Sequence, residues 1–454
     1  RNVTGVQTCA LPISPLFGGM PQTREAIELQ ITQEYFGQSR HLVYLVPMWK
    51  TTLDFDMAAG APARPVKAIV QGRQGFKAGG MVGVANIGLS DTWSGSHLAQ
   101  ANLYGFGRLA WNANLSSSQI ADEWVYQTFT TEAASASTIT RILETSWRTF
   151  ENYTGPLGLQ TLTDIVGNHY GVNVEASERN GWGQWHKADE QGVGFDRTVA
   201  TGTGFIGQYW AQPAAVYESL KDCPDDLLLF MHHVPYTYRL RSGKTVIQYL
   251  YDSHYDGADA VARYVRDWKT LEAKIDQPRY ASVLAQLDYQ AGQAIVWRDA
   301  VTRWFARASK IPDDRGRVGN YPGRMEAEGA TLSGYAVKPV VPWEAASGDV
   351  VECAGPGPCT AVFRYIGPAG PRDITVRYFD TNTGASRFSL SVAGIVVSRW
   401  TADDHVLVKN DKVDASSSSR RVLTGVMLQS GDEIRILGTP EGRETAALDY
   451  IEIR

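Results

Sequence analysis

The chain has 454 residues, a formal net charge of −5 and a sequence pI near 6.0, and 43% of its residues are hydrophobic. This length is too great for a single hydrophobic core and predicts two or three domains. The weakly acidic balance excludes the basic surface typical of nucleic-acid-binding proteins, and no apolar run reaches the ~20 residues of a membrane helix. We therefore expect neither nucleic acid nor a membrane as a partner.

The first thirteen residues, RNVTGVQTCALPI, have no helical or strand period and resemble the translation of a sequencing adapter. We exclude residues 1–13 from the fold as non-native and expect the native chain to start near Ser14. Any signal peptide would precede this point, so the localisation cannot be read directly.

Residues 14–114 combine strand-like and helical stretches. In LQITQEYFGQ and the residues before it, apolar Ile27, Leu29 and Ile31 alternate with polar residues, which is the period of a half-buried β-strand. The runs HLVYLV and GGMVGVANIG are also strand-like, and the second precedes a run with apolar residues at helical spacing. Strand followed by helix predicts an α/β arrangement.

Residues 115–310 read as mainly helical. Ser116 and Gln119 have the spacing of a capping box, and Ile120 and Trp124 follow on one helical face. Residues 311–323 are rich in Gly, Pro and Asp and predict a linker. Residues 324–454 contain short strand-like runs separated by turn signals, which predicts an all-β sandwich.

Two cysteines, Cys353 and Cys359, flank a Gly/Pro-rich loop of five residues in ECAGPGPC. They form either a small disulfide, which would suit an extracellular or periplasmic compartment, or two unpaired thiols. The sequence contains no CxxC pair and no HExxH motif, so a zinc site is not expected.

Four segments between Ser14 and Lys310 carry a family resemblance: PLFGGMPQTREAIELQITQEYFGQSRHLVYLVPMWK, MVGVANIGLSDTWSGSHLAQANLYGFGRLAWN, HKADEQGVGFDRT and LLLFMHHVPYTYRLRSGKT. On these segments the chain resembles glycoside hydrolase family 67, the α-glucuronidases of xylan breakdown. The resemblance implies that residues 14–114 are the C-terminal part of a (β/α)8 barrel and that residues 115–310 form the family's mainly helical domain. It also implies inverting hydrolysis of terminal (4-O-methyl)-D-glucuronic acid α-1,2-linked to xylose in glucuronoxylan oligosaccharides.

The resemblance assigns the general base to Glu34, because a base-side glutamate of the family lies in the motif matched here by QITQEY. Taken alone, a glutamate at the end of a strand is more often solvated than catalytic. The family's general acid and a second base-side Asp lie upstream of the matched region. We therefore expect this chain to be inactive by itself, and we expect no cofactor for catalysis.

Further substrate-binding candidates follow the strand-like runs. Trp49 and Trp93 each have the chemistry to stack on a sugar or to fill the core. Lys50 is able to pair with an anionic sugar, or more simply with Asp54 four residues on. His232 and His233 lie in a motif shared with the family, where they line the xylan-side rim, line a subunit interface or, more simply, act as hydrogen-bonded structural residues. The resemblance also implies a homodimer through the helical domain.

The final domain resembles the calcium-binding β-sandwich carbohydrate-binding modules of families 6 and 35, on the segments RMEAEGATL and ALDYIEI. This resemblance implies that Glu326, Glu328 and Asp449 hold a structural calcium ion. Trp343 and Trp400 are candidates for stacking on sugars, although core packing is expected for at least one of them. The alternative function is a non-catalytic carbohydrate-binding protein that acts through this sandwich.

Overall fold

The computed structural model divides into two compact units. It describes residues 14–17, 22–33, 35–56, 63–160, 162–163, 170–176, 184–341, 347–403 and 411–454. The first unit contains the described residues within Arg1–Ile165, Glu175–Ala291 and Arg307–Ile311, and the second contains those within Val166–Val174, Gly292–Ala306 and Pro312–Arg454. The expected linker, residues 311–323, thus falls almost wholly in the second unit, where Asp313 is buried and pairs with Arg317. The expected adapter-like segment 1–13 lies outside the described residues.

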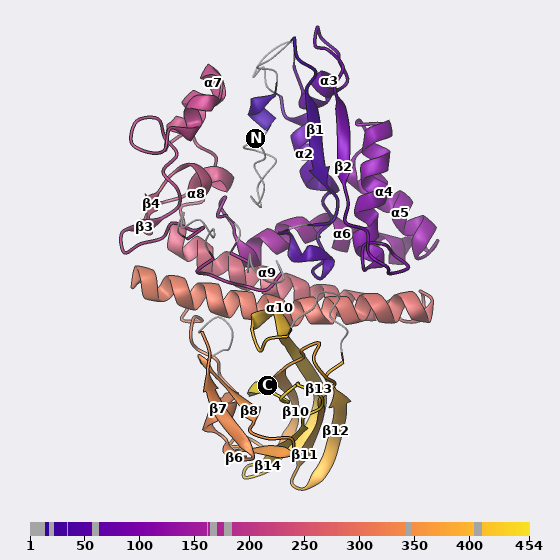
Figure 1. The fold of residues 1–454 in the computed structure, drawn as a ribbon, viewed down its shortest axis with the longest axis vertical. Helices are drawn as coiled ribbons and strands as arrows, with labels where there is room; N and C mark the ends of the chain where they lie inside the picture. Colours follow the sequence, from indigo (N-terminus) through magenta and orange to yellow (C-terminus); the bar gives the residue numbers. More distant parts are fainter. Residues whose placement is uncertain are drawn as a thin grey trace. The chain divides into compact units, whose positions relative to one another are not determined.

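Two parallel strands open the first unit, β1 (Ala26–Gln30) and β2 (Gly80–Val84), paired in register along their whole length (Figure 1). Helices α2 (Val46–Asp54) and α3 (Val66–Val70) lie between them in the sequence, as a parallel pair requires a crossover connection. Ile27 and Leu29 are buried while Glu28 is exposed, which confirms the alternation expected from the sequence. Helix α4 (His97–Trp111) follows β2.

The run HLVYLV is not a strand, and here the sequence-based expectation is wrong. Its residues are buried without regular structure until α2 begins at Val46. Three of its backbone N–H groups donate to side-chain oxygens from three helices, each over 2.8 Å: Leu42 to Gln290, Tyr44 to Ser146 and Leu45 to Asn102. Side chains therefore replace the partner strand that this apolar run would otherwise need.

The remaining regular structure in the described part of the first unit is helical, apart from one short antiparallel pair. The long ones are α5 (Ser117–Thr128), α6 (Ala133–Thr154) and α9 (Val246–Lys269), and α10 (Gln277–Ser309) has residues in both units. Shorter elements are η1 (Ser14–Leu16), η2 (Gly37–Ser39), η3 (Phe205–Gln208), α7 (Ala211–Glu218), η4 (Asp225–Leu227), α8 (Leu228–Met231), β3 (Gly192–Val193) and β4 (Val234–Pro235). Ser116 and Gln119 form the predicted capping box at the start of α5. No helix among the described residues is long and apolar enough to span a membrane.

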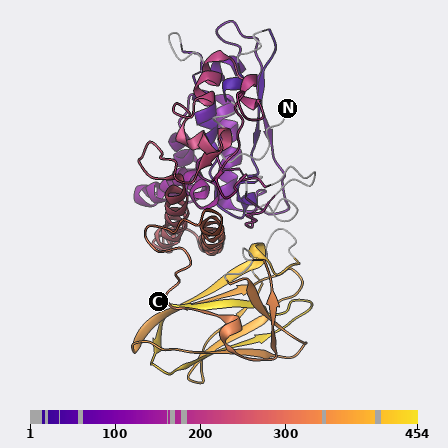
Figure 2. The same ribbon diagram turned by 90° about the vertical axis from the view of Figure 1, so that its left-hand side faces the viewer.

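The second unit contains the predicted β-sandwich, with two antiparallel sheets facing each other (Figure 2). One sheet has the order β13-β10-β15-β8-β7, with β5 also paired to β15, and the other has the order β12-β11-β14-β9-β6. The strands are β5 (Arg324–Glu326), β6 (Thr331–Ser333), β7 (Tyr335–Pro339), β8 (Asp349–Cys353), β9 (Cys359–Arg364), β10 (Gly370–Phe379), β11 (Arg387–Val392), β12 (Ile395–Thr401), β13 (Ser418–Leu428), β14 (Glu433–Thr439) and β15 (Leu448–Ile453). Short 3-10 turns lie at η5 (Ala327–Gly329) and η6 (Ala415–Ser417). The inner faces bury one apolar core, in which Ile374 and Ile451 are fully covered.

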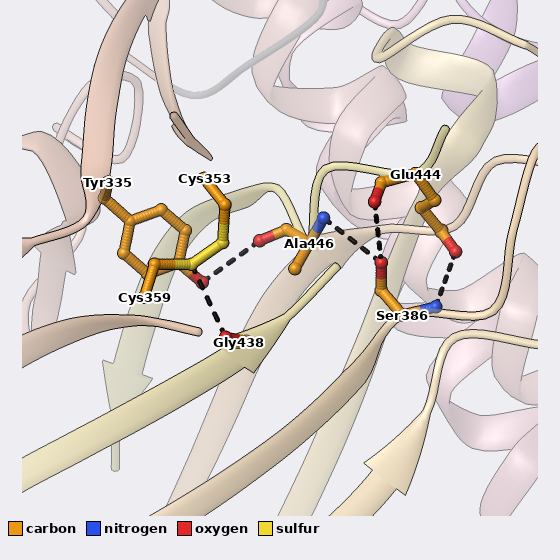
Figure 3. Close-up of a disulfide and its surroundings, with 7 residues drawn as sticks. All are labelled: Tyr335, Cys353, Cys359, Ser386, Gly438, Glu444 and Ala446. Carbon is orange, nitrogen blue, oxygen red and sulfur yellow. Dashed lines mark hydrogen bonds between the residues drawn. A yellow bond between two sulfur atoms is a disulfide. The ribbon is translucent and has the colours of Figure 1, made fainter. Parts of the chain in front are cut away.

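A disulfide joins Cys353 and Cys359, so the first of the two alternatives for these cysteines holds (Figure 3). It connects the end of β8 to the start of β9, with the two Cα atoms 5.7 Å apart. The ring of Tyr335 lies beside it, and its hydroxyl donates to the backbone oxygen of Ala446 over 3.0 Å. Both sulfur atoms are therefore built into the sandwich core.

Candidate functional site

The carboxyl ends of the two parallel strands are the place to look for chemistry, because α/β proteins bind ligands at that edge of the sheet. Glu34, the candidate base, comes four residues after the end of β1 and lies outside the described residues. Its sequence neighbour Gln33 is fully buried. The Gln33 side-chain amide donates to the backbone oxygens of Phe36 and His41 over 3.0 and 2.8 Å, which closes the segment from 33 to 41 into a compact loop.

The backbone of this loop is strained. Gln33 and Tyr35, on either side of Glu34 in the sequence, have φ angles of 56° and 61°, and Gln38 and Ser39 also have positive φ. Such angles are uncommon for residues with a side chain, and they concentrate at ligand-binding and catalytic sites, where the surrounding structure holds them in place. The strain thus falls where the sequence places the candidate base.

The loop after β2 lies at the same edge. The backbone N–H of Ile31 donates to the backbone oxygen of Val84 over 2.8 Å. The backbone N–H of Asn86 donates to the hydroxyl oxygen of Thr32 over 3.4 Å. Further along this loop, Trp93 is 57% exposed and has a positive φ of 61°. Its ring therefore has an accessible face, as stacking on a sugar would require.

The two other substrate-binding candidates have structural roles in this chain. Trp49 lies in α2 rather than after a strand, is 1% exposed and packs edge-on against Phe106, so its ring offers no face to a sugar. Lys50 pairs with Asp54 over 2.9 Å and donates to the backbone oxygen of Ala113. Trp49 thus has the core position, and Lys50 the ion pair with Asp54, that the sequence analysis gave as their alternatives to sugar binding.

A histidine that the sequence analysis overlooked supports the loop. His41 is fully buried, and its Nδ1 lies 2.8 Å from the hydroxyl oxygen of Tyr153 in α6. Burial, reinforced by the positive charge of Arg40, lowers the His41 pKa to about 3, so the ring stays neutral and packs as an uncharged group. A lone histidine in an apolar stretch carries no signal of this role in its sequence.

The shared histidine pair lies elsewhere in the first unit. His232 is buried, and its Nε2 lies 2.8 Å from the backbone oxygen of Tyr217. Burial lowers the His232 pKa. His233 Nε2 lies 3.3 Å from a carboxylate oxygen of Asp189. Both contacts are those of structural histidines.

The three calcium candidates lie in the sandwich, on β5, on the following turn η5 and on β15. Glu326 and Glu328 each bury one carboxylate oxygen that has no hydrogen-bond partner among the described residues. Burial, and then the neighbouring carboxylates of Asp449 and Glu328, raise the Glu326 pKa to about 7. Asp449, in contrast, pairs with Arg377 over 2.8 Å.

Two of the three carboxylates therefore fit a cation, because each glutamate leaves a buried oxygen unsatisfied. Within the described ranges no group of three His, Cys, Asp or Glu residues is arranged to hold a metal ion. The candidate sugar-stacking residue Trp400 is partly buried against the sandwich core, with its ring stacked on Phe388 at 5.3 Å. Trp343 lies outside the described residues.

The chain thus contains a parallel α/β element with a strained loop after its first strand, a helical part and a β-sandwich. Two family descriptions match it: "Glycosyl hydrolase family 67 middle domain" over residues 8–93 and "Glycosyl hydrolase family 67 C-terminus" over residues 94–318. The chain belongs to glycosyl hydrolase family 67.

Curated relatives agree with this membership. A "Probable alpha-glucuronidase A" of Aspergillus flavus is 46% identical over 446 residues, which cover 97% of this chain and 53% of the relative. An "Alpha-glucuronidase" of Hypocrea jecorina is 45% identical over 446 residues, covering 97% and 52%. The chain therefore spans about half the length of the relatives it matches.

Among solved structures, the chain is similar to a family 35 carbohydrate binding module from Clostridium thermocellum, with a TM-score of 0.24 and 15% identity over 29% of this chain and 96% of that one. It is also similar to a CBM35 structure from Paenibacillus barcinonensis, with a TM-score of 0.23 and 21% identity over 29% and 97% of the two chains.

Proposed function

We propose that the whole protein containing this chain is an inverting α-glucuronidase. It removes terminal (4-O-methyl)-D-glucuronic acid α-1,2-linked to xylose from glucuronoxylan oligosaccharides. One observation carries the proposal: relatives named α-glucuronidases match 97% of the chain at 44–46% identity. Because those relatives are about twice as long, we propose that this chain alone is inactive and that the general acid and the second base-side carboxylate lie in the remaining half.

The proposed base is Glu34. In an inverting glycosidase one carboxylic acid protonates the leaving oxygen, and a carboxylate removes a proton from the water that attacks the opposite face of the sugar. Gln33 and the strained backbone at Tyr35 support this role, because the residues next to Glu34 in the sequence are held by hydrogen bonds and uncommon backbone angles, as residues beside a preorganised catalytic group are.

Replacing Glu34 with Gln in the whole enzyme tests the assignment. We expect kcat to fall by roughly 10²–10⁴-fold, since a neutral amide cannot accept the proton of the attacking water. KM should change little, because the amide keeps the size and polarity of the carboxylate. The exposed Glu272, which follows α9, gives a matched control when changed to Gln. Near-normal turnover of the Glu34→Gln enzyme would rule this residue out as the base.

We further propose that β1 and β2 are neighbouring strands of a (β/α)8 barrel in the whole protein. Their parallel pairing and helical crossover support this arrangement. So does the exposed apolar face of β2, where Val82 and Val84 are 53% and 37% exposed, because closing the barrel would cover these side chains. A crystal structure of the whole protein tests the proposal, which fails if neither β1 nor β2 gains a further strand neighbour.

For the sandwich we propose a structural calcium ion held by Glu326 and Glu328, with Asp449 completing the site by exchanging its ion pair with Arg377 for the cation. The two unsatisfied carboxylate oxygens support it. Calcium should raise the melting temperature of this chain relative to excess EGTA, because a ligand that binds only the folded state stabilises it. Glu326→Gln should remove that difference, and Glu433→Gln on an exposed strand position should leave it intact. Equal melting temperatures in calcium and EGTA would argue against the ion.

Assembly and location are proposals as well. A homodimer would be tested by light scattering of the whole protein in solution. The disulfide between Cys353 and Cys359 supports an extracellular or periplasmic location, since such bonds persist in oxidising compartments. Titrating free thiols in protein isolated from its native source under alkylating conditions would test that location.

A further inference from the structure

Helix α10 contacts both loops of the candidate site through a single side chain. The side-chain amide of Gln286 donates to the backbone oxygen of Ser39 over 3.0 Å, in the loop that follows β1. Its oxygen accepts from the Ser96 hydroxyl over 2.5 Å. Ser96 is the N-cap of α4, three residues after Trp93. One glutamine thus joins the loop of the proposed base to the loop of the exposed tryptophan.

The contact is part of a larger support made by one face of α10. Gln290, one helical turn after Gln286, is fully buried and binds both backbone groups of Leu42, with its oxygen accepting from the Leu42 N–H over 2.8 Å. Its side-chain nitrogen also donates to the Tyr153 hydroxyl over 3.1 Å. Between them, Tyr289 lies under the guanidinium of Arg40 at 4.6 Å. Residues 39–42 are therefore tied to α10 at four points.

The two glutamines differ in what they connect. Gln290 binds the first loop and α6, whereas Gln286 binds the first loop and the second. The hydroxyl oxygen of Ser96 accepts from the backbone N–H groups of Leu98 and Ala99 at the start of α4. Its hydroxyl proton remains available, and Ser96 donates it to the side-chain oxygen of Gln286. The bridge thus depends on an amide that both donates and accepts, which no carboxylate or apolar side chain of that size can do.

We propose that Gln286 is a positioning residue for the glycosidase reaction, holding the loop of Glu34 at a fixed distance from the loop of Trp93. The proposal rests on the proposed function. It assigns to the helical part of the chain a direct role in the geometry of the site, since sugar and base must be placed together for the base to reach its water. A displacement of about 1 Å in such a site lowers the rate by about 100-fold.

The first experiment measures the bridge itself, without reference to activity. Hydrogen–deuterium exchange is compared for the 454-residue chain and its Gln286→Met variant, which keeps the volume of the side chain but removes both bonds. We expect exchange to become at least tenfold faster in both residues 35–42 and residues 94–99. Gln277→Met, at an exposed position of the same helix, should change neither segment. Unchanged exchange in either loop would overturn the proposal.

The second experiment measures catalysis in the whole enzyme. Gln286→Met should lower kcat at least tenfold, and Gln277→Met should not. Gln286→Glu supplies a conditional rescue: an ionised carboxylate repels the Ser39 oxygen, while a protonated one donates to it as the amide does. The rate of Gln286→Glu relative to the unaltered enzyme should therefore rise as the pH falls toward 4–5, near the ordinary pKa of a glutamate.

The outcomes separate the two proposals. If the unaltered whole enzyme does not release glucuronic acid, the proposed function fails, whereas the exchange experiment still tests the bridge. If the unaltered enzyme is active and Gln286→Met has the same kcat, the positioning role fails while the function stands. A pH-independent rate ratio for Gln286→Glu would also overturn the role, because a merely structural loss would not track this proton.

Discussion

The buried carboxyl of Glu151 should make the stability of this chain depend on pH. Glu151 lies in α6 with its side chain 2% exposed, and one of its oxygens has no hydrogen-bond partner among the described residues. Burial raises its pKa from an ordinary 4.5 to about 8, and the carboxylate of Asp226 adds to this effect. The guanidinium of Arg148, 3.1 Å away, opposes it but does not cancel it.

The direction in which stability changes with pH depends on whether the folded or the unfolded chain holds the Glu151 proton more tightly. Between pH 4.5 and about 8 the unfolded chain has lost the Glu151 proton while the folded chain keeps it, so stability falls as the pH rises through this window. Each pKa unit corresponds to about 1.4 kcal/mol, so the ionised carboxylate at high pH costs the folded state about 5 kcal/mol.

Glu151→Gln removes the titrating group and keeps an oxygen for Arg148. Urea unfolding of both proteins from pH 4.5 to 9 should give nearly equal free energies at the acid end and a more stable Gln variant, by several kcal/mol, at the alkaline end. Other titrating groups cancel in this difference, and the exposed Glu272→Gln variant should follow the unaltered chain. Parallel pH profiles for the two proteins would refute the reasoning.

Two further predictions concern tryptophans whose burial differs sharply, and a third concerns the disulfide. Trp93→Ala in the whole enzyme should raise KM and leave the melting temperature unchanged, because its ring is mostly exposed; an unaltered KM would count against sugar stacking. Trp49→Ala should instead destabilise this chain by about 3–5 kcal/mol in urea unfolding, because it empties a core position. Replacing Cys353 and Cys359 together with Ser should lower the free energy of unfolding of the sandwich by about 2 kcal/mol, since a bond between residues six positions apart closes only a short loop. Calorimetry of both forms measures this loss, and a clearly smaller loss would contradict the prediction.

Much of the fold could be predicted because the relevant signals are local. The period-two pattern at Ile27 and Leu29 depends only on which side of one strand is covered, and the capping box at Ser116 needs only Gln119 three residues later. The sandwich strands could be predicted for the same reason, since each is a short strand-like run with turn residues on either side.

The predictions that failed depended on distant partners. HLVYLV has the composition of a strand, but Leu42 finds its partner 248 residues away in Gln290, and no local pattern records that pairing. Trp49 comes directly after this mistaken strand, so its expected position behind a strand was wrong too, and it lies inside α2. The roles of His41 and Gln286 were not visible at all, because isolated polar residues in apolar or helical stretches become informative only when their neighbours are known.

The segment from Leu42 to Leu45 has a practical consequence for anyone who redesigns this protein. Its shape is dictated by side chains from three helices, so the segment around β1 and β2 cannot be transplanted onto another scaffold by copying strands and turns alone. A scaffold without counterparts of Asn102, Ser146 and Gln290 would bury three backbone N–H groups without hydrogen-bond acceptors. Grafts should therefore carry the helices along with the strand edge that they support.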